Sequence, residues 1–212
     1  MAEFVNAMLN GVSPDGQHYY PAFPYTNYQD MFIEDVMDLK LFLDTLPASN
    51  NKVESHTLKF PYSSRRGIGL WKQLYLEKPP MQSRPGQLSA YERGKYLVEG
   101  PGHCGACHTP RDSFGGKIEK KNLAGARALE INPDSSDKKT EWNPNLTSHS
   151  DGLAGWSDRD ISYLLETGFT PDFDTVGGSM VEVQENLAHL PLSDLQAIAA
   201  YLKSLPAIAT PE

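Results

Sequence analysis

The only two cysteines of the 212-residue chain lie close together, in the stretch Cys104-Gly-Ala-Cys107-His108. Three ordinary uses of such a pair explain it poorly. A structural zinc site normally needs a second Cys or His pair at similar spacing, which the sequence lacks. A thioredoxin-like redox site follows a strand, whereas the flanks here favour a helix and then a loop. A plain disulfide would use both thiols but gives no reason for His108.

A fourth use accounts for all three residues. The pattern C-x-x-C-H is typical of the attachment site of a c-type heme, where each thiol forms a thioether with one vinyl group of the porphyrin. The histidine that follows then lies beneath the porphyrin, and its imidazole binds the iron. We therefore predict one covalent heme c, held by Cys104 and Cys107, with His108 as an iron ligand.

The second axial ligand of such an iron must come from elsewhere in the chain. Met180 is favoured because it lies well downstream of His108, in a loop whose paired glycines allow close approach to a flat ligand. A His/Met pair raises the reduction potential and suits electron transfer. A lone methionine is more often core filler, so this assignment depends on the heme's need for a ligand. The alternative ligands, each of which would lower the potential, are His103, His149 and His189.

Short amphipathic helices are predicted around these residues. They cover 89–99, 157–167 and 193–205, where apolar side chains recur at intervals of three and four residues. Ser157 and Ser193 are the expected N-caps of the second and third helices. Another short helix is predicted over 67–76, with Ile68, Trp71, Leu74 and Tyr75 together on one face. Numerous prolines and glycines between such segments predict an all-α protein with long loops.

The composition excludes several kinds of partner. The chain carries 27 acidic and 19 basic residues, for a formal net charge of −8. This charge argues against binding to nucleic acid or to an anionic membrane, and for partners with a basic or neutral docking face. Its apolar runs are short and interrupted by charges, so no membrane-spanning helix is expected. Residues 1–10 also lack the features of a secretory signal peptide.

Four segments, taken in order, resemble the class I c-type cytochromes. These segments are "SAYERGKYLVEGPGHCGACHTPR", "NPNLTSHSDGLAGWSDRDISYLLETG", "GGSMVEV" and "PLSDLQAIAAYLKSLP". They look like the first helix entering the heme motif, the propionate-side loop with its helix, the distal methionine loop and the C-terminal helix. Within this family the chain is most similar to bacterial multi-domain, diheme-type cytochrome c subunits that serve periplasmic dehydrogenases. The resemblance implies a class I cytochrome c fold around the heme.

The resemblance also implies roles for further residues and partners. Arg111 and Trp156 occupy positions that contact the heme propionates in the family. Arg65 and Arg66 are weaker candidates, because an arginine pair is more often a solvated face. The family implies a periplasmic location, a dehydrogenase as electron donor, and an oxidase or another cytochrome as acceptor. It implies an electron carrier rather than an enzyme.

The N-terminal part of the chain repeats the C-terminal part. Residues 3–16 match 160–173 at a constant offset of 157, and residues 33–47 match 192–206 after a two-residue gap. Such matched turns and helices indicate duplicated units. We predict three regions: 1–47 as the back half of a cytochrome-like domain lacking its own CxxCH, 48–83 as a linker, and 84–212 as a complete heme domain. Phe23 stands opposite Met180 in this alignment, and Met31 is interpreted as core filler.

Two other classes of function remain open on the sequence. One is a heme enzyme of the thiosulfate-oxidising or peroxidatic diheme type, which requires an iron with an open or Cys/His-ligated position. The other is a heme-free docking module left by truncation. Neither a nucleophile beside a base nor a proton-transfer pair is recognisable, so the sequence favours the electron carrier.

Overall fold

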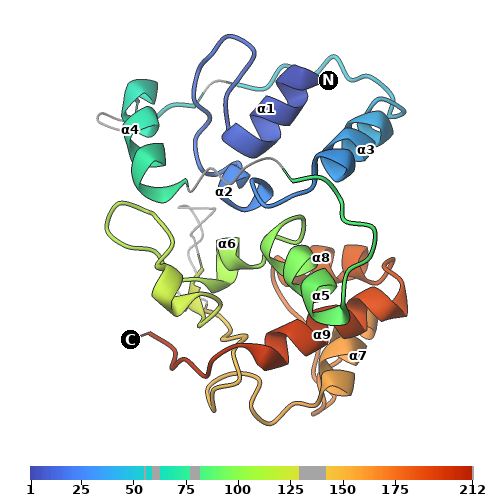
Figure 1. Cartoon of the computed structure of the whole chain (residues 1–212). Coiled ribbons are helices and arrows are strands. Elements are labelled where there is room, and N and C mark those ends of the chain that lie inside the picture. Colours follow the sequence, from blue (N-terminus) through green and yellow to red (C-terminus); the bar gives the residue numbers. More distant parts are fainter. Residues whose placement is uncertain (55, 59–62, 77–81, 129–141, 212) are drawn as a thin grey trace. The chain divides into compact units, whose positions relative to one another are not determined.

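The computed structural model describes residues 1–54, 56–58, 63–76, 82–128 and 142–211. The chain forms two compact units, unit 1 from Met1 to Gly86 and unit 2 from Gln87 to Glu212. The described residues are helix-rich with few strands, consistent with a cytochrome c fold (Figure 1). Unit 1 contains α1 (Ala2–Asn10), α2 (Tyr25–Tyr28), α3 (Ile33–Leu43) and α4 (Arg65–Tyr75). Unit 2 contains α5 (Ala90–Glu99), α6 (Gly105–His108), η1 (Glu119–Lys121), β1 (Ala126–Arg127), β2 (Trp142–Asn143), α7 (Asp158–Thr167), α8 (Met180–Leu187) and α9 (Leu192–Ser204).

The core of unit 2 is built on α5 and α9, which pack directly against each other (Figure 1). Gly94 makes the close approach of the two helices possible, because a Cβ placed on it would lie 1.9 Å from the carbonyl oxygen of Ala197. Arg93 adds a bidentate ion pair across the same interface: its Nε and Nη2 donate to the Asp194 carboxylate at 3.0 and 2.7 Å. The buried stripe of α9 contains the four apolar residues expected from the sequence: Leu195, Ile198, Ala199 and Leu202.

Helix α7 covers another side of α9. It begins as predicted at Ser157, whose hydroxyl accepts from the Asp160 backbone N–H while the Asp160 carboxylate accepts from the Ser157 N–H. It ends as predicted at Gly168, which has a φ of 80°. The predicted cap of α9 was wrong: α9 starts one residue before Ser193, its N-cap is Pro191, and it has no side-chain cap.

The strictly all-α expectation also needs one correction. Strands β1 and β2 form a two-stranded antiparallel ribbon, with Ala126 opposite Asn143 and Arg127 opposite Trp142. The Arg127 guanidinium lies 5.6 Å from the centre of the Trp142 ring, which adds a cation–π contact to the pair. Two-residue strands carry almost no periodic signal, so hydrophobic patterning does not reveal them.

Unit 1 has a small apolar core of its own. Met31 lies in this core, 5% exposed, packed with Met8, Leu9 and Val36. Phe23, the residue opposite Met180 in the repeat, packs against the same cluster. The position of Met31 agrees with its interpretation as core filler.

Helix α4 lies where the sequence predicts a helix over 67–76, and its one buried residue is a lysine outside the predicted apolar face. Leu74 is 70% exposed, whereas Lys72 is 4% exposed. The Lys72 ammonium donates to the carbonyl oxygens of Asn10 and Gly11, each at 2.6 Å, and lies 4.6 Å from the centre of the Tyr25 ring. The buried charge is therefore stabilised by the C-terminal carbonyls of α1, where a helix dipole favours a cation.

The internal repeat is reproduced in the backbone. Helices α1 and α7 both end at a glycine with positive φ, Gly11 and Gly168. The turn that follows each helix contains the same hydrogen bonds at an offset of 157, including the pairs Tyr19 N to Gly11 O and Val176 N to Gly168 O. The isolated bridges Val12–His18 and Phe169–Thr175 obey the same offset. The two segments therefore share one turn structure, while the assignment of 1–47 to a partial cytochrome domain stays a prediction.

The repeat predicts a stabilising substitution at Phe173. This residue has a φ of 62°, is 91% exposed, and stands where the first copy has Gly16 with a φ of 75°. A left-handed conformation costs an L residue about 1–2 kcal/mol, partly offset by the greater backbone entropy that glycine loses on folding. Phe173→Gly is therefore expected to raise the free energy of unfolding by about 0.5–1 kcal/mol in chemical denaturation.

Gly16→Ala is the reciprocal control for this prediction. No atom lies within 4 Å of a Cβ built on Gly16, so its φ is the only obstacle, and a loss of about 1 kcal/mol is expected. A Phe173→Gly variant no more stable than the parent would show that backbone strain at this turn is relieved in another way.

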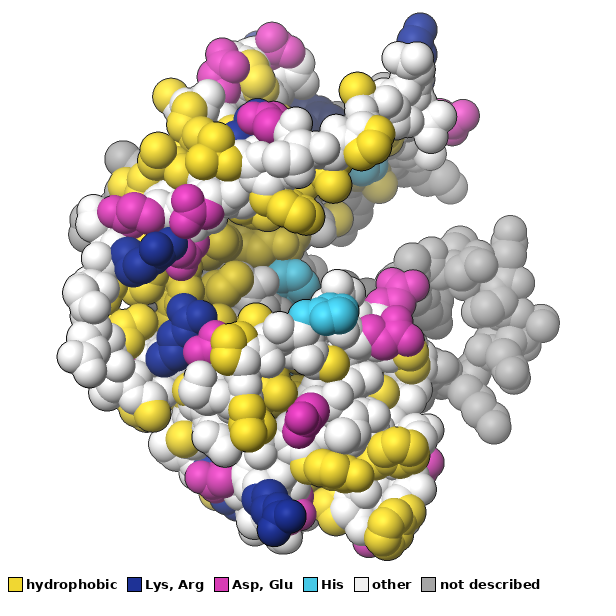
Figure 2. Space-filling view, turned by 90° about the vertical axis from the view of Figure 1, so that its right-hand side faces the viewer, with side chains coloured by type: hydrophobic (Ala, Val, Ile, Leu, Met, Phe, Trp, Pro, Cys, Tyr) yellow, Lys and Arg dark blue, Asp and Glu magenta, His cyan; other side chains and the backbone are white. Residues whose placement is uncertain are grey.

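None of the helices in the described part of the chain has the length and apolarity needed to cross a membrane. On the face shown in Figure 2, acidic side chains are scattered among basic and apolar ones rather than gathered in one patch.

Candidate functional site

The cysteine motif folds as one helical turn attached to the end of α5. The backbone N–H of Gly102 donates to the carbonyl of Leu97 at 2.8 Å, and that of Cys104 donates to Val98 at 3.1 Å. A Cβ on Gly102 would lie 2.4 Å from the Leu97 carbonyl oxygen, so this turn requires glycine. Helix α6 starts directly after Cys104 and carries the motif to His108.

The two thiols differ in their surroundings. Cys104 is partly buried and Cys107 is exposed, and no disulfide joins them. Burial raises the pKa of the Cys104 thiol to about 12, and the negative charge of Glu99 adds to the effect. With both sulfurs as free thiols on one helical turn, the motif has the chemical form that thioether attachment requires.

The His108 imidazole is buried and oriented by a backbone acceptor. Its Nδ1 lies 2.8 Å from the carbonyl oxygen of Pro144, and the ring is 8% exposed. Because a carbonyl can only accept, the proton resides on Nδ1, which leaves Nε2 with the lone pair that binds a metal. Burial lowers the pKa of His108, which favours this neutral form. Sequence reasoning missed Pro144, since nothing in its spacing marks it as a partner of His108.

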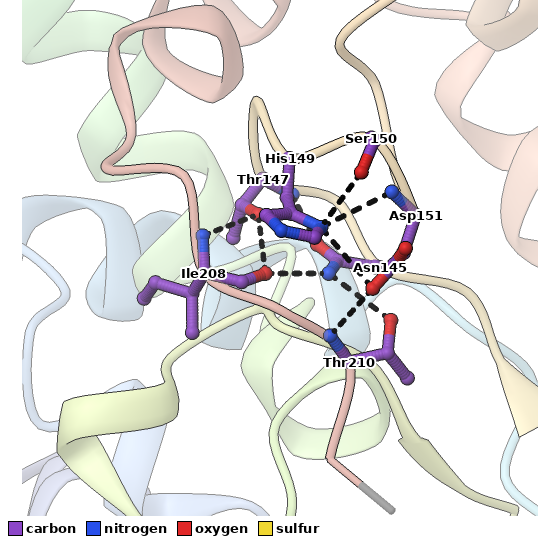
Figure 3. Close-up of polar contacts among 7 residues, drawn as sticks. All are labelled: Asn145, Thr147, His149, Ser150, Asp151, Ile208 and Thr210. Atoms are coloured by element: carbon purple, nitrogen blue, oxygen red, sulfur yellow. Dashed lines mark hydrogen bonds and ion pairs between the residues drawn. The ribbon is translucent and has the colours of Figure 1, made fainter.

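The loop that contains Pro144 is held on both sides. Asn143 Nδ2 donates to the Cys107 carbonyl at 2.9 Å, which ties the loop to the motif. Asn145 Nδ2 donates to the carbonyl of Ile208 at 2.8 Å, and the Ile208 N–H donates to the Thr147 hydroxyl at 3.2 Å (Figure 3). The segment after α9 thus braces the loop that orients His108.

The two residues predicted to bind propionates lie at well-defined places in unit 2. Arg111 donates from Nη1 to the Gly115 carbonyl at 2.8 Å and from Nη2 to the Ala106 carbonyl at 3.1 Å, so it braces α6 against the next loop. Burial lowers the pKa of its guanidinium. Trp156 is half-buried and directly precedes the N-cap of α7. The propionate roles of both stay predictions.

Arg65, the weaker candidate, donates to the His18 carbonyl within unit 1 at 2.9 Å and lies over the Tyr20 ring. Arg66 is exposed.

Met180, the predicted distal ligand, is the first residue of α8 and is partly exposed. Among the alternative ligands, His149 is paired with Asp151, with Nδ1 3.1 Å from the carboxylate (Figure 3). His189 is exposed, and His103 lies in the motif turn with a φ of 39°. Burial lowers the pKa of His103. Met180 therefore stays the predicted ligand. It is the first residue of α8, whereas His149 already pairs with the Asp151 carboxylate.

No protein-family model matches the chain. The chain is 45% identical over 209 residues to a diheme cytochrome c-type protein from Cereibacter sphaeroides. The aligned region covers 98% of this chain and 66% of that protein. It is 34% identical over 213 residues to the cytochrome c subunit of a quinone-dependent alcohol dehydrogenase from Gluconobacter oxydans, covering 98% of this chain and 44% of that subunit.

A third relative is the cytochrome subunit of fructose dehydrogenase from Gluconobacter japonicus. It is 33% identical over 216 residues, covering 99% of this chain and 42% of that subunit. The chain therefore spans less than two thirds of the length of each of these three relatives. In each case the similarity extends over both units rather than over the cysteine motif alone.

Proposed function

Since the chain belongs to the c-type cytochromes, in the group that contains diheme cytochromes c and the cytochrome c subunits of dehydrogenases, we propose that it carries single electrons. In this proposal, unit 2 holds one heme c through Cys104 and Cys107, with His108 and Met180 as axial ligands. The bound heme supplies an iron that alternates between its ferrous and ferric states. The observation that carries the proposal is the Nδ1 contact of His108 with Pro144, beside two free thiols.

The residues of the chain have separate roles in this proposal. Cys104 and Cys107 tether the heme at its edge, and α6 places both sulfurs on the same turn as His108. Pro144 keeps the proton on Nδ1 of His108, which orients the ring and makes it a better ligand. Arg111 and Trp156 would contact the propionates, since a buried carboxylate needs a charged or N–H donor partner.

The proposed partners are other redox proteins. The relatives named above include subunits of alcohol and fructose dehydrogenases, which favours a dehydrogenase as the electron donor. An oxidase or another cytochrome would be the acceptor, and the periplasm is the compartment in which heme c is attached in the resembling family. The chain itself would transfer electrons without transforming an organic substrate.

An optical spectrum with heme quantified per polypeptide tests the proposal. We expect one heme per chain that survives denaturation, because thioether bonds are covalent, and a six-coordinate spectrum in both oxidation states. Rapid binding of carbon monoxide or cyanide would instead support the heme enzyme. Absence of any visible absorption after expression with the heme-attachment machinery would leave only the heme-free docking module.

A further inference from the structure

A hydrogen-bonded network of polar side chains connects the end of α5 with α9 and with the residue that follows His108. The proposed function does not use this network. Its centre is Glu99, the last residue of α5. Glu99 Oε1 accepts from the Tyr201 hydroxyl of α9 at 2.7 Å and from Asn122 Nδ2 at 2.9 Å. Both groups are donors, which is the arrangement that an ionised carboxylate requires of its neighbours.

The network continues to the residue that follows His108. The Thr109 hydroxyl donates to Asn122 Oδ1 at 2.8 Å and accepts from the Leu123 N–H at 2.9 Å. Thr109 is 1% exposed, so water does not compete for these bonds. Glu99 is therefore connected to the iron-binding end of the motif through Asn122 and Thr109, in a chain whose donors and acceptors all match.

Glu99 also lies near the other end of the motif. The turn from Gly100 to Cys104 folds back on the C-terminal end of α5, which brings the first cysteine to the helix end that carries Glu99. Burial is the main cause of the raised pKa of the Cys104 thiol, and the negative charge of Glu99 adds to it. A negative charge is thus held near the first cysteine and linked through Asn122 and Thr109 to the end of the motif that carries His108, and Tyr201 and Asn122 restrict its position.

A fixed charge in a partly buried site acts on a nearby redox centre more strongly than it would in water. Ferric iron carries one more positive charge than ferrous iron, so a carboxylate stabilises the ferric state. We propose that Glu99 lowers the reduction potential of the heme held by Cys104 and Cys107, and that the Tyr201 hydroxyl moderates this effect. The inference rests on the proposed function, because it requires a heme in unit 2.

Potentiometric titration of the heme-loaded Glu99→Gln variant tests the inference. Glutamine keeps the shape of glutamate and an acceptor oxygen for Tyr201 and Asn122, but removes the charge. We expect the equilibrium to shift about tenfold towards the ferrous form, which corresponds to a potential about 59 mV higher for one electron. Because the carboxylate of Glu99 is partly buried, salt screens its charge less than that of an exposed group, so the shift should persist at high salt.

Glu92→Gln is the matched control for this experiment. It removes the same charge from the same helix, but at an exposed position roughly 10 Å earlier along the axis. Its heme potential should equal that of the parent protein. A shift of the same size in Glu92→Gln would show that only the net charge matters, and would overturn the specific role of Glu99.

Tyr201→Phe gives a second test with the opposite sign. It removes a donor to Glu99 and leaves the charge, so the potential should fall; a merely structural network would move both variants in the same direction. If Glu99→Gln does not fold, the heme reduction potential of Tyr201→Phe by itself decides whether the inference holds. A loaded Glu99→Gln variant with the parent potential would overturn this inference only, whereas a chain without covalent heme would overturn the proposed function as well.

Discussion

Replacing Gly94 by alanine is expected to destabilise unit 2 by about 2 kcal/mol, because a steric cost of about 3 kcal/mol, the upper end of the usual cost of overpacking a core, is only partly offset. The new Cβ would lie 1.9 Å from the carbonyl oxygen and 2.5 Å from the carbonyl carbon of Ala197. Both atoms belong to the backbone of α9, so the two helices must separate. The helix preference of alanine over glycine offsets only about 1 kcal/mol of this cost, so the steric effect decides the sign.

Urea denaturation of the purified full chain measures the effect as a lower midpoint. Gly155→Ala is the matched control, because a Cβ on Gly155 has no atom within 4 Å, and its midpoint should stay close to that of the parent. A Gly94→Ala variant as stable as the parent would mean that α5 and α9 can move apart at little cost. In that case their contact would not be the main source of stability in unit 2.

Replacing Met180 by histidine is expected to lower the heme reduction potential by on the order of 0.1 V or more, within the span of about 0.8 V that axial ligands cover. The physical reason is the chemistry of the ligand. A thioether sulfur favours ferrous iron, whereas an imidazole stabilises ferric iron better. Met180 opens α8 and is partly exposed, so its side chain is not committed to the apolar core.

Potentiometry of the loaded protein tests this prediction, with Met37→His as the control. Met37 is a partly exposed methionine of α3 in unit 1, so the same substitution there should leave the potential unchanged. An unchanged potential in Met180→His would remove Met180 from the iron. The search for the second ligand would then move to His103, His149 and His189.

The helices show how local signals predict local structure. Ser157 and Gly168 bound α7 as expected, because a serine cap and a left-handed glycine act on backbone groups only a few residues away. The cap predicted at Ser193 was wrong, since Pro191 starts α9 earlier. The burial of Lys72 was not predicted, because its ammonium reaches carbonyl acceptors at the end of α1, more than sixty residues earlier in the chain.

The internal repeat could also be predicted from the sequence, because its signals are local. The helix end and turn of each copy lie within about fifteen residues. The offset of 157 therefore relates matching residue types in the sequence and matching backbone hydrogen bonds in the structure. The family resemblance was confirmed by relatives that are 33–45% identical over almost the whole chain. Neither the ligand role of Met180 nor the propionate roles of Arg111 and Trp156 is tested by these observations, and they stay predictions.

The chemistry of the motif was already decided by residue identity and spacing. Two thiols and an imidazole within five positions are brought onto one helical turn by local backbone structure alone, so their combination could be interpreted without a fold. The surroundings of the motif depend on tertiary structure. Pro144 is 36 residues from His108, and Tyr201 is 102 residues from Glu99. Such partners meet only because α5 and α9 pack together and the loops close over α6, and no short-range pattern in the sequence encodes that meeting.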